Sequence, residues 1–455
     1  MTDPQPSAPP TPTTPDRPYK RLSPLTPLVR SFVLVVAVAA SSWDDFLRGD
    51  VGPLAWILLA MLLAGAVYGA ASWLRTKYWI EADELRVDTG VISRQSRRIR
   101  VDRLQGIDIA QPFVARLFGL AELKMDVAGA GDREGSLAYL PLREAEALRE
   151  TLLARRDAAR ARRAPGDQAE QGPTAMPHAV PEHVLARLDL GLLVMSLLIS
   201  PEAFAFLVSA LVLGGVFVVL GNLPGAAVAL PVFIGFVLTQ LRRLSAYYGF
   251  TVSETPAGLQ VRRGLIDRNT QTITLSRVQG VVVSEPVFWR RFGWARVDVS
   301  VAGYGSGGGE NGRPAVSTVM PVGPRNVVLW LARRLLEETG SPDPDEVVLV
   351  PPPPRARWVA PVGRHFMSSG VGPHLLVSRS GFLNRRTHAV PHARVQSLQL
   401  HQGPWQRRLG LADLHVDSPP GPVRVRAQHR DAADVRGLLE EANRLARDAR
   451  TRLTG

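Results

Sequence analysis

The stretch from Gly264 to Gly303, GLIDRNTQTITLSRVQGVVVSEPVFWRRFGWARVDVSVAG, decides the fold of this chain because it occurs three times. The segments that begin at Gly90 and Gly381 align with it without a gap. Agreement at so many fixed offsets indicates three copies of one structural unit. The copies are irregularly spaced along the chain, so we do not expect a solenoid.

Four kinds of residue recur at the same offsets in all three copies. They are a leading glycine, an arginine, a glutamine two positions later and a second glycine: Gly90, Gly264 and Gly381; Arg103, Arg277 and Arg394; Gln105, Gln279 and Gln396; Gly119, Gly293 and Gly410. A residue repeated between divergent copies is more often architectural than functional. We therefore expect the arginines and glutamines to make hydrogen bonds within the fold. The leading glycine follows a strand, where a hairpin turn requires a positive φ.

Each copy is expected to be a small α+β module. Alternating or β-branched runs such as Thr270–Leu275 and Gly280–Val283 predict antiparallel strands. The end of each copy has Leu and Val at three-to-four spacing with Arg and Glu opposite. This pattern predicts amphipathic helices over about 142–156, 324–338 and 431–447.

Two apolar regions predict membrane-spanning helices. Leu54–Leu74 carries no charge, and about 20 helical residues cross a hydrocarbon core of about 30 Å. A shorter apolar stretch, Ser31–Ser42, precedes it and would form the first helix of the same hairpin. Leu190–Leu241 would form two more helices, with Pro201 as a candidate kink and Gly221–Gly225 as the hairpin tip. We therefore expect four transmembrane helices in two hairpins. The alternative is a pair of buried core helices in a soluble protein.

Basic residues at the ends of these regions predict the orientation. Arg75 and Lys77 follow the first region, Arg187 precedes the second, and Arg242 and Arg243 follow it. Because Lys and Arg favour the cytoplasmic side, both termini and all three copies should lie at the inner leaflet of the plasma membrane.

Composition excludes some chemistry. The chain has 455 residues and no cysteine, which removes disulfides, thiol nucleophiles and Cys-ligated metal sites. Lys+Arg 54 against Asp+Glu 41 gives a net charge of +13, which favours an anionic partner such as lipid or nucleic acid. Aromatic residues are sparse and no basic helix stands out, so we do not expect nucleic acid.

The expected segments follow one another along the chain. They are a disordered tail 1–24, a transmembrane hairpin 25–77, a first copy 78–160, a linker 161–186, a second hairpin 187–243, a second copy 244–339, a Pro-rich linker 340–362 and a third copy 363–450. The run Pro351–Pro354 predicts a semi-rigid polyproline spacer.

A family resemblance is carried by the step Arg103–Gln105, the turn Arg116–Gly119, their counterparts in the other copies and the preceding hairpins. With these features the chain resembles the bacterial pleckstrin-homology-like membrane proteins, the YdbS-like PH domain family. The resemblance covers about residues 18–450. It implies a multi-domain membrane protein with four transmembrane α-helices and three α+β PH-like domains. Each domain would be a bent, partly open β-barrel capped by a C-terminal helix. The third copy departs from the pattern, since no hairpin precedes it and its strand region near 419–422 is shortened.

A basic cluster in the first copy is the candidate lipid-headgroup site. It consists of Arg94, Arg97, Arg98 and Arg100. Residues two apart on a strand share a face, so Arg98 and Arg100 should point the same way. Near an anionic bilayer each basic side chain contributes about 1 kcal/mol. The alternative is a solvated basic face without a ligand.

No pattern of catalytic or cofactor-binding residues stands out. The run Gly303–Gly308 (GYGSGG) matches G-x-G-x-x-G but does not lead into a helix, so it is interpreted as a hairpin tip. His388 and His392 would stand about 13 Å apart on a strand, too far for one metal ion. We therefore expect no enzyme, no metal and no cofactor.

The function that the sequence favours is binding or scaffolding at the inner leaflet. The partners would be lipid headgroups or a protein, which could be another PH-like membrane protein. Strand addition to a sheet edge is one mode of binding that a PH-like sheet offers. The alternative function is an accessory subunit of a membrane export or envelope-stress system.

Overall fold

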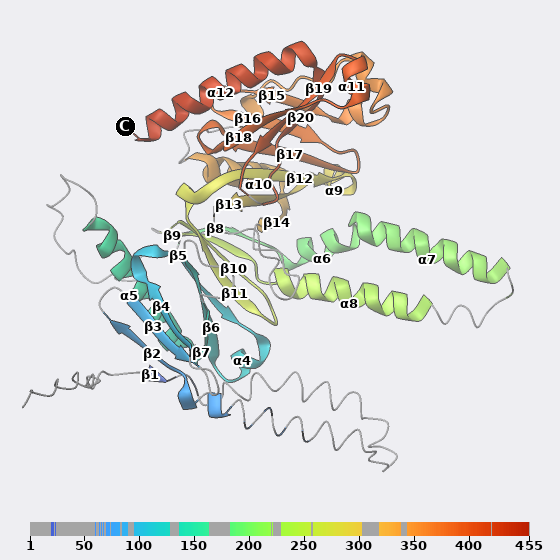
Figure 1. Cartoon of the computed structure of the whole chain (residues 1–455). Coiled ribbons are helices and arrows are strands. Elements are labelled where there is room, and N and C mark those ends of the chain that lie inside the picture. The colour runs from blue at the N-terminus through green and yellow to red at the C-terminus, as the bar shows by residue number, and fades with distance from the viewer. Residues whose placement is uncertain are drawn as a thin grey trace, which may run out of the picture. The chain divides into compact units, whose positions relative to one another are not determined.

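The structure is a computed structural model. Before residue 74 it describes isolated positions, and beyond that it describes 74–81, 84–89, 95–127, 136–162, 183–219, 221, 229–255, 258–302, 318–337, 344–419 and 421–454. The expected tail, most of the first hairpin, Gly90, Arg94 and the GYGSGG run lie outside the described residues. The chain divides into two compact units (Figure 1). One holds most of the first copy, and the other holds the apolar helices and the second and third copies.

All three copies have the same order of elements: three strands, a 3₁₀ turn, a strand, a short helix, two strands and a longer helix. The first copy comprises β2 (Lys77–Glu81), β3 (Glu84–Thr89), β4 (Gln95–Arg100), η1 (Val101–Arg103), β5 (Leu104–Gln111), α4 (Phe113–Leu117), β6 (Leu120–Val127), β7 (Ser136–Pro141) and α5 (Leu142–Ala161). The second comprises β9 (Thr251–Thr255), β10 (Gly258–Arg263), β11 (Arg268–Ile273), η3 (Leu275–Arg277), β12 (Val278–Pro286), α9 (Val287–Arg291), β13 (Trp294–Val301), β14 (Thr318–Pro324) and α10 (Arg325–Leu336). The third comprises β15 (Ser368–Val371), β16 (Leu375–Ser380), β17 (Asn384–Pro391), η8 (His392–Arg394), β18 (Ser397–His401), α11 (Pro404–Arg408), β19 (Leu411–Asp417), β20 (Arg426–Asp431) and α12 (Ala432–Thr454).

The strands of a copy are split between two sheets. In the first unit, β1 (Lys20–Arg21), β2, β3 and β4 form one antiparallel sheet in that order. In the second unit, a six-stranded sheet has the order β14-β13-β12-β17-β16-β15. The last half of the second copy and the first half of the third therefore share one continuous sheet. The strands β18, β19 and β20 form a separate three-stranded sheet.

This shared sheet serves two hydrophobic cores because side chains alternate along a strand. Val281 and Val283 of β12 belong to the core of the second copy, with Leu331 and Leu335 of α10. Val282, between them, belongs to a core of the third copy with Ala442 of α12. Figure 1 shows α10 and α12 on opposite sides of this sheet. A fully buried Val or Leu side chain contributes about 1.5–3 kcal/mol, so both cores stabilise the junction.

The second apolar region forms a helical hairpin. It consists of α6 (Leu190–Leu198), α7 (Pro201–Val219) and α8 (Ala229–Tyr247). Among the described helices, none alone has the length and hydropathy that crossing a bilayer requires, whereas α6 and α7 together do, with a bend of 41° between them. The break falls directly before Pro201, the proline that the sequence marked as a candidate kink. The last helix continues to Tyr247, beyond the expected end near 241.

Two segments expected as linkers are part of the folded second unit. Residues His183–Arg187 form β8, which pairs with β9, and its Leu185 and Ala186 pack against the core of the second copy. The Pro-rich segment is no free spacer. It contains η6 (Pro354–Trp358), whose Ala356 is buried, and Val350 pairs with Ser369 of β15.

Candidate membrane-interface surface

A hydrophobic pair follows the leading glycine in the second and third copies. Gly264 and Gly381 have φ values of +108° and +99°. A Cβ atom at either position would lie about 2 Å from a backbone oxygen, that of Asp267 or Asn384 (1.9 and 2.1 Å), so only glycine closes these turns. The turns leave the next two side chains exposed: Leu265 (45%), Ile266 (48%), Phe382 (53%) and Leu383 (60%).

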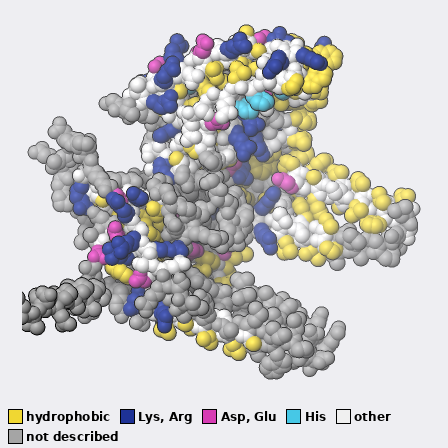
Figure 2. Space-filling view, in the orientation of Figure 1, with side chains coloured by type: hydrophobic (Ala, Val, Ile, Leu, Met, Phe, Trp, Pro, Cys, Tyr) yellow, Lys and Arg dark blue, Asp and Glu magenta, His cyan; other side chains and the backbone are white. Residues whose placement is uncertain are grey.

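The hairpin tip of the second copy is bonded to the end of α8. The backbone nitrogen of Leu265 donates to the carbonyl oxygen of Ser245 at 2.8 Å, and that of Ile266 donates to the Ser245 hydroxyl at 3.3 Å. The two exposed side chains therefore lie beside the last turn of the apolar hairpin. Figure 2 shows hydrophobic side chains over the outer parts of α7 and α8 and basic side chains near their inner ends.

The hairpin tip of the third copy reaches the same helical hairpin through α9. The backbone nitrogen of Val287 donates to the Leu383 oxygen at 2.7 Å, and Arg290 donates to the Phe382 oxygen at 2.7 Å. The other side of α9 packs on the helices. There the Phe288 ring lies 5.1 Å from that of Phe204 in α7. Trp289 in turn donates from Nε1 to the Ser196 oxygen in α6 at 3.2 Å.

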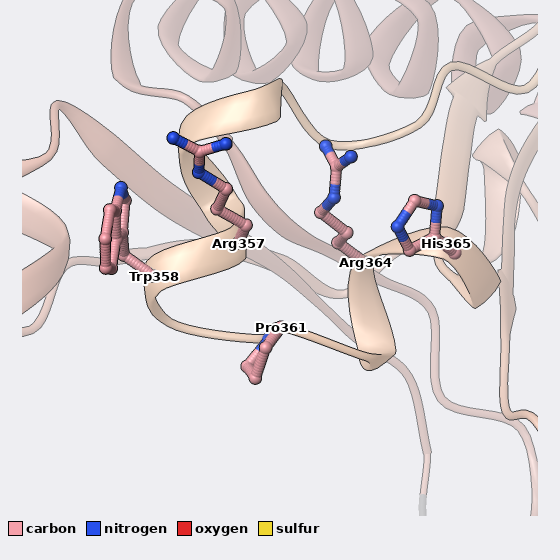
Figure 3. A pocket seen from close by; sticks show the side chains of 5 residues that line it. All are labelled: Arg357, Trp358, Pro361, Arg364 and His365. Atoms are coloured by element: carbon pink, nitrogen blue, oxygen red, sulfur yellow. The ribbon is translucent and has the colours of Figure 1, made fainter.

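An open hollow of about 530 Å³ lies next to this tip, lined by Arg357, Trp358, Pro361, Arg364 and His365. The Phe366 ring, which follows His365, packs on the Phe382 ring with centroids 4.7 Å apart. Figure 3 shows the guanidinium groups of Arg357 and Arg364 extending to the same side of the loop, with the Trp358 ring beside Arg357. The Arg357 guanidinium carbon lies 5.3 Å from the Trp358 ring centroid.

We call Trp358, Val362, Phe382, Leu383, Arg357 and Arg364 the interface patch. Its aromatic and aliphatic members are more than half exposed, with Trp358 at 72% and Val362 at 66%. Large aromatic side chains beside arginines are typical of protein surfaces at the membrane–water boundary. There the aromatic rings lie at the level of the headgroups, and guanidinium groups pair with phosphates. The patch is joined to the apolar hairpin through the contacts of α9.

The predicted arginine cluster of the first copy lies on β4. Arg98 and Arg100 are exposed on one face, as the strand period predicts, whereas Arg97 lies on the other face beside the buried Ile99. Arg100 Nη2 lies 2.9 Å from the Asp102 carboxylate. Arg98 stands opposite Arg86, which is paired with Glu81 and Glu84. Carboxylates thus offset the charge of Arg100 and of the neighbouring Arg86, which weakens these two positions as an anion site.

The repeated arginines and glutamines lie at the same point of each copy. Arg103, Arg277 and Arg394 each end a 3₁₀ turn. Arg277 bonds to the Ala302 oxygen, and Arg394 donates to the Ser276 oxygen of the second copy at 2.5 Å. Gln279 donates to the Arg277 oxygen at 3.0 Å. These bonds support the architectural interpretation for the second and third copies.

The second repeated glycine closes the short helix in every copy. Gly119, Gly293 and Gly410 have φ values of +67°, +66° and +62°. Each carbonyl oxygen accepts from the backbone at or next to the start of the long helix, at Leu142, Arg325 or Ala432 respectively, at 2.8–3.0 Å. At this glycine the three copies therefore agree in conformation and in hydrogen bonding as well as in sequence.

His388 and His392 of the third copy are buried and separately bonded. His388 Nδ1 accepts from the Arg424 backbone nitrogen at 3.2 Å, and burial lowers the His388 pKa to about 4, assisted by Arg386, Arg424 and Arg426. His392 Nε2 lies 2.8 Å from the Gly372 oxygen. Within the described part of the chain, no three His, Asp or Glu side chains are grouped as metal ligands.

Sequence reasoning missed the interface patch. The hydrophobic pair after each leading glycine was visible in the alignment, as Val91–Ile92, Leu265–Ile266 and Phe382–Leu383. Trp358 lies in the segment that was interpreted as a spacer, and no periodic signal marks it. Only the contact between Phe366 and Phe382 brings that segment to the hairpin tip.

Two half-sheets closed by a C-terminal helix, repeated three times and joined to an apolar hairpin, define a membrane-associated protein of PH-like domains. A family model described as "Bacterial PH domain" matches residues 31–156, 203–335 and 358–446, and the chain belongs to this family. The chain is 24% identical over 292 residues to the UPF0699 transmembrane protein YdbT of Bacillus subtilis (strain 168). The match covers 58% of this chain and 56% of that protein, so the chain spans just over half of its relative's length. No solved structure matches.

Proposed function

We propose that this protein is a non-catalytic membrane-anchored scaffold whose PH-like domains bind the anionic surface of the inner leaflet. The helical hairpin α6–α8 fixes the second copy at the bilayer. The interface patch of the third copy then adds a second contact, in which Trp358 enters the headgroup region and Arg357 and Arg364 pair with lipid phosphates.

One observation carries the proposal. The exposed Phe382–Leu383 tip is bonded to α9, and α9 packs directly on α6 and α7. An exposed apolar surface rimmed by charge is typical of a membrane or protein contact. Its connection to an apolar hairpin favours the membrane. The third copy lacks a hairpin of its own, and the patch supplies an attachment in its place.

The distribution of arginines supports the cytoplasmic side. Arg187 lies just before α6, and Arg242 and Arg243 lie in the last part of α8. By the positive-inside preference, the proposed orientation has the hairpin tip outside and the copies inside.

The test places a fluorescent probe in the patch of the full-length chain. Because the chain has no cysteine, Val362→Cys can carry a single NBD fluorophore. Glu440→Cys, exposed on α12, is the matched control site. After reconstitution in vesicles containing phosphatidylglycerol, NBD at 362 is expected to shift to the blue, and NBD at 440 is not.

The arginines are tested in the same assay. Arg357→Glu with Arg364→Glu should abolish the difference between phosphatidylglycerol and phosphatidylcholine vesicles at position 362, and Arg436→Glu on α12 should leave it unchanged. Water-like emission from position 362 in both lipids would contradict the proposed lipid contact.

A further inference from the structure

Consecutive copies are joined in the second unit by pairing a strand of one copy with a strand of the next. At the first junction β5 pairs with β11, with Gln111 opposite Arg268. At the second junction β12 pairs with β17, with Glu285 opposite Arg385. Both pairings are antiparallel.

The two junctions have the same register. Gln111 and Glu285 occupy equivalent positions in their copies when the sequences are aligned at Gly90 and Gly264. Arg268 and Arg385 are likewise equivalent. The copies therefore contain a donor strand and an acceptor strand that meet in one fixed way. This geometry belongs to the repeated unit and not to one particular pair of copies.

In the third copy, the strand of the first kind pairs with no other copy among the described strands. The strand equivalent to β5 and β12 is β18, which forms an edge of its sheet among the described strands. All nine residues of β12 are buried, whereas Ser397, Gln399, Leu400 and His401 of β18 are exposed. An edge strand presents backbone N–H and C=O groups that can pair with another chain.

In the first copy, the strand of the second kind pairs with no other copy among the described strands. Its strand β4 is the equivalent of β11 and β17, and it forms the edge of the sheet β1-β2-β3-β4 among the described strands. Its side chains are mostly exposed, Ile99 being the buried one. Among the described strands, the chain thus carries one edge strand of each kind, β18 in the third copy and β4 in the first.

We propose that β18 of one molecule pairs with β4 of a second copy of this chain. Transferring the register of the two internal junctions places Leu400 opposite Ser96 and Gln399 opposite Arg97. The contact is head-to-tail, so it generates rings or open rows of molecules in the plane of the membrane. Backbone hydrogen bonds supply the affinity, as in other strand additions.

The intermolecular contact is weaker than the internal ones. The first residue of the short helix, Phe113 or Val287, donates its backbone N–H to the turn of the next copy at the two internal junctions. The equivalent residue in the third copy is Pro404, which has no N–H to donate. Because this hydrogen bond is missing, we expect the assembly to be reversible and to form at high local concentration in the membrane.

Disulfide crosslinking in membranes tests the proposal and its register. One chain carries Leu400→Cys and a differently tagged chain carries Ser96→Cys, and both are co-expressed. Both sites are exposed, so the variants should fold, and the absence of other cysteines removes background. Paired residues of antiparallel strands stand within the Cα separation that a disulfide requires. Oxidation should give a mixed dimer, and Gln399→Cys with Arg97→Cys should do the same.

Pairs displaced by two residues are the matched controls. Leu400→Cys with Arg98→Cys, and Gln399→Cys with Gln95→Cys, should crosslink at least fivefold less. Equal crosslinking yields for the matched and the displaced pairs would overturn the proposal. The absence of any mixed dimer would overturn it as well, and would indicate that the arginines of β4 prevent this edge from pairing with another strand. A chain with both Ser96→Cys and Leu400→Cys that closes only on itself would overturn it as well.

Discussion

Glu285 joins two copies of the repeat through Arg385: its Oε2 atom accepts a hydrogen bond of 2.7 Å from Arg385 Nε across the β12–β17 pair. The other carboxylate oxygen, Oε1, accepts from Arg325 Nε at 2.9 Å, and Arg325 begins α10 of the second copy. The Glu285 side chain is 5% exposed. One buried carboxylate thus holds an arginine from each side of the junction.

Glu285→Ala should destabilise the junction by about 3 kcal/mol, because removing one partner of a buried ion pair leaves the others unpaired. Glu285→Gln should cost less, since glutamine still accepts a hydrogen bond and stands at the equivalent position of the first junction, as Gln111. Thermal unfolding of the full chain in detergent measures both. Glu337→Ala, at a half-exposed carboxylate paired with Arg334, should cost under about 1 kcal/mol. Equal losses for Glu285→Ala and Glu337→Ala would contradict this account.

The two kinds of repeated glycine should differ in their tolerance of alanine. Gly264→Ala places a Cβ atom 1.9 Å from the Asp267 oxygen at a φ of +108°, so it should destabilise the second copy by about 3 kcal/mol or more. Gly293→Ala at a φ of +66° has no heavy atom within 4 Å of the new Cβ, and its cost should be about 1–2 kcal/mol. Protease resistance of the two variants in membranes provides the comparison. A Gly264→Ala protein as resistant as the wild type would show that the turn can be rebuilt.

Acid should weaken the third copy through His388. Burial lowers its folded pKa to about 4, against about 6.5 in the unfolded chain. Above pH 6.5 the His388 side chain is neutral in both the folded and the unfolded chain, so its titration does not change the free energy of unfolding. As the pH falls from 6.5 to 4, the unfolded state gains the proton first, so stability declines by up to about 3 kcal/mol. Denaturant unfolding at pH 7 and pH 4.5 measures the loss.

The control for this prediction is His388→Asn. Its amide oxygen can still accept from the Arg424 nitrogen but does not titrate in this range. Between pH 7 and pH 4.5 the variant should lose less stability than the wild type. Burial also lowers the pKa of His392, so some acid sensitivity should persist. Identical losses in both proteins would exclude His388 as a source.

The proposed orientation is tested with single cysteines at two exposed sites. Gly221→Cys lies beyond the end of α7, and Glu440→Cys lies on α12. A membrane-impermeant maleimide should label position 221 in intact cells, and position 440 only after the cells are opened. Labelling at 440 in intact cells would place the copies outside the membrane.

The sequence predicted the repeat well because its signals are local. Gly264 and Gly381 are required by turns whose φ lies near +100°, and the β-branched run Gly280–Val283 predicts a strand, which is buried on both faces. The starts of the three terminal helices were located within one residue, whereas the first and third helices extend beyond their expected ends. The candidate site was less predictable. The arginines of β4 were visible as a cluster, but the Asp102 carboxylate that pairs with Arg100 lies in the following turn. The carboxylates of Glu81 and Glu84 pair with Arg86 on the neighbouring strand.

By itself, the sequence determined that one α+β unit is present three times and that it accompanies long apolar segments, because turn glycines and hydrophobic periodicity depend on neighbouring residues. Only the tertiary structure decided that consecutive copies share sheets in a common register, that the Pro-rich segment packs beside the Phe382 turn, and that β4 and β18 are edges. These features depend on strand pairing and ring contacts between residues distant in the chain, such as Glu285 with Arg385. A local pattern shows that a strand exists but does not name its partner.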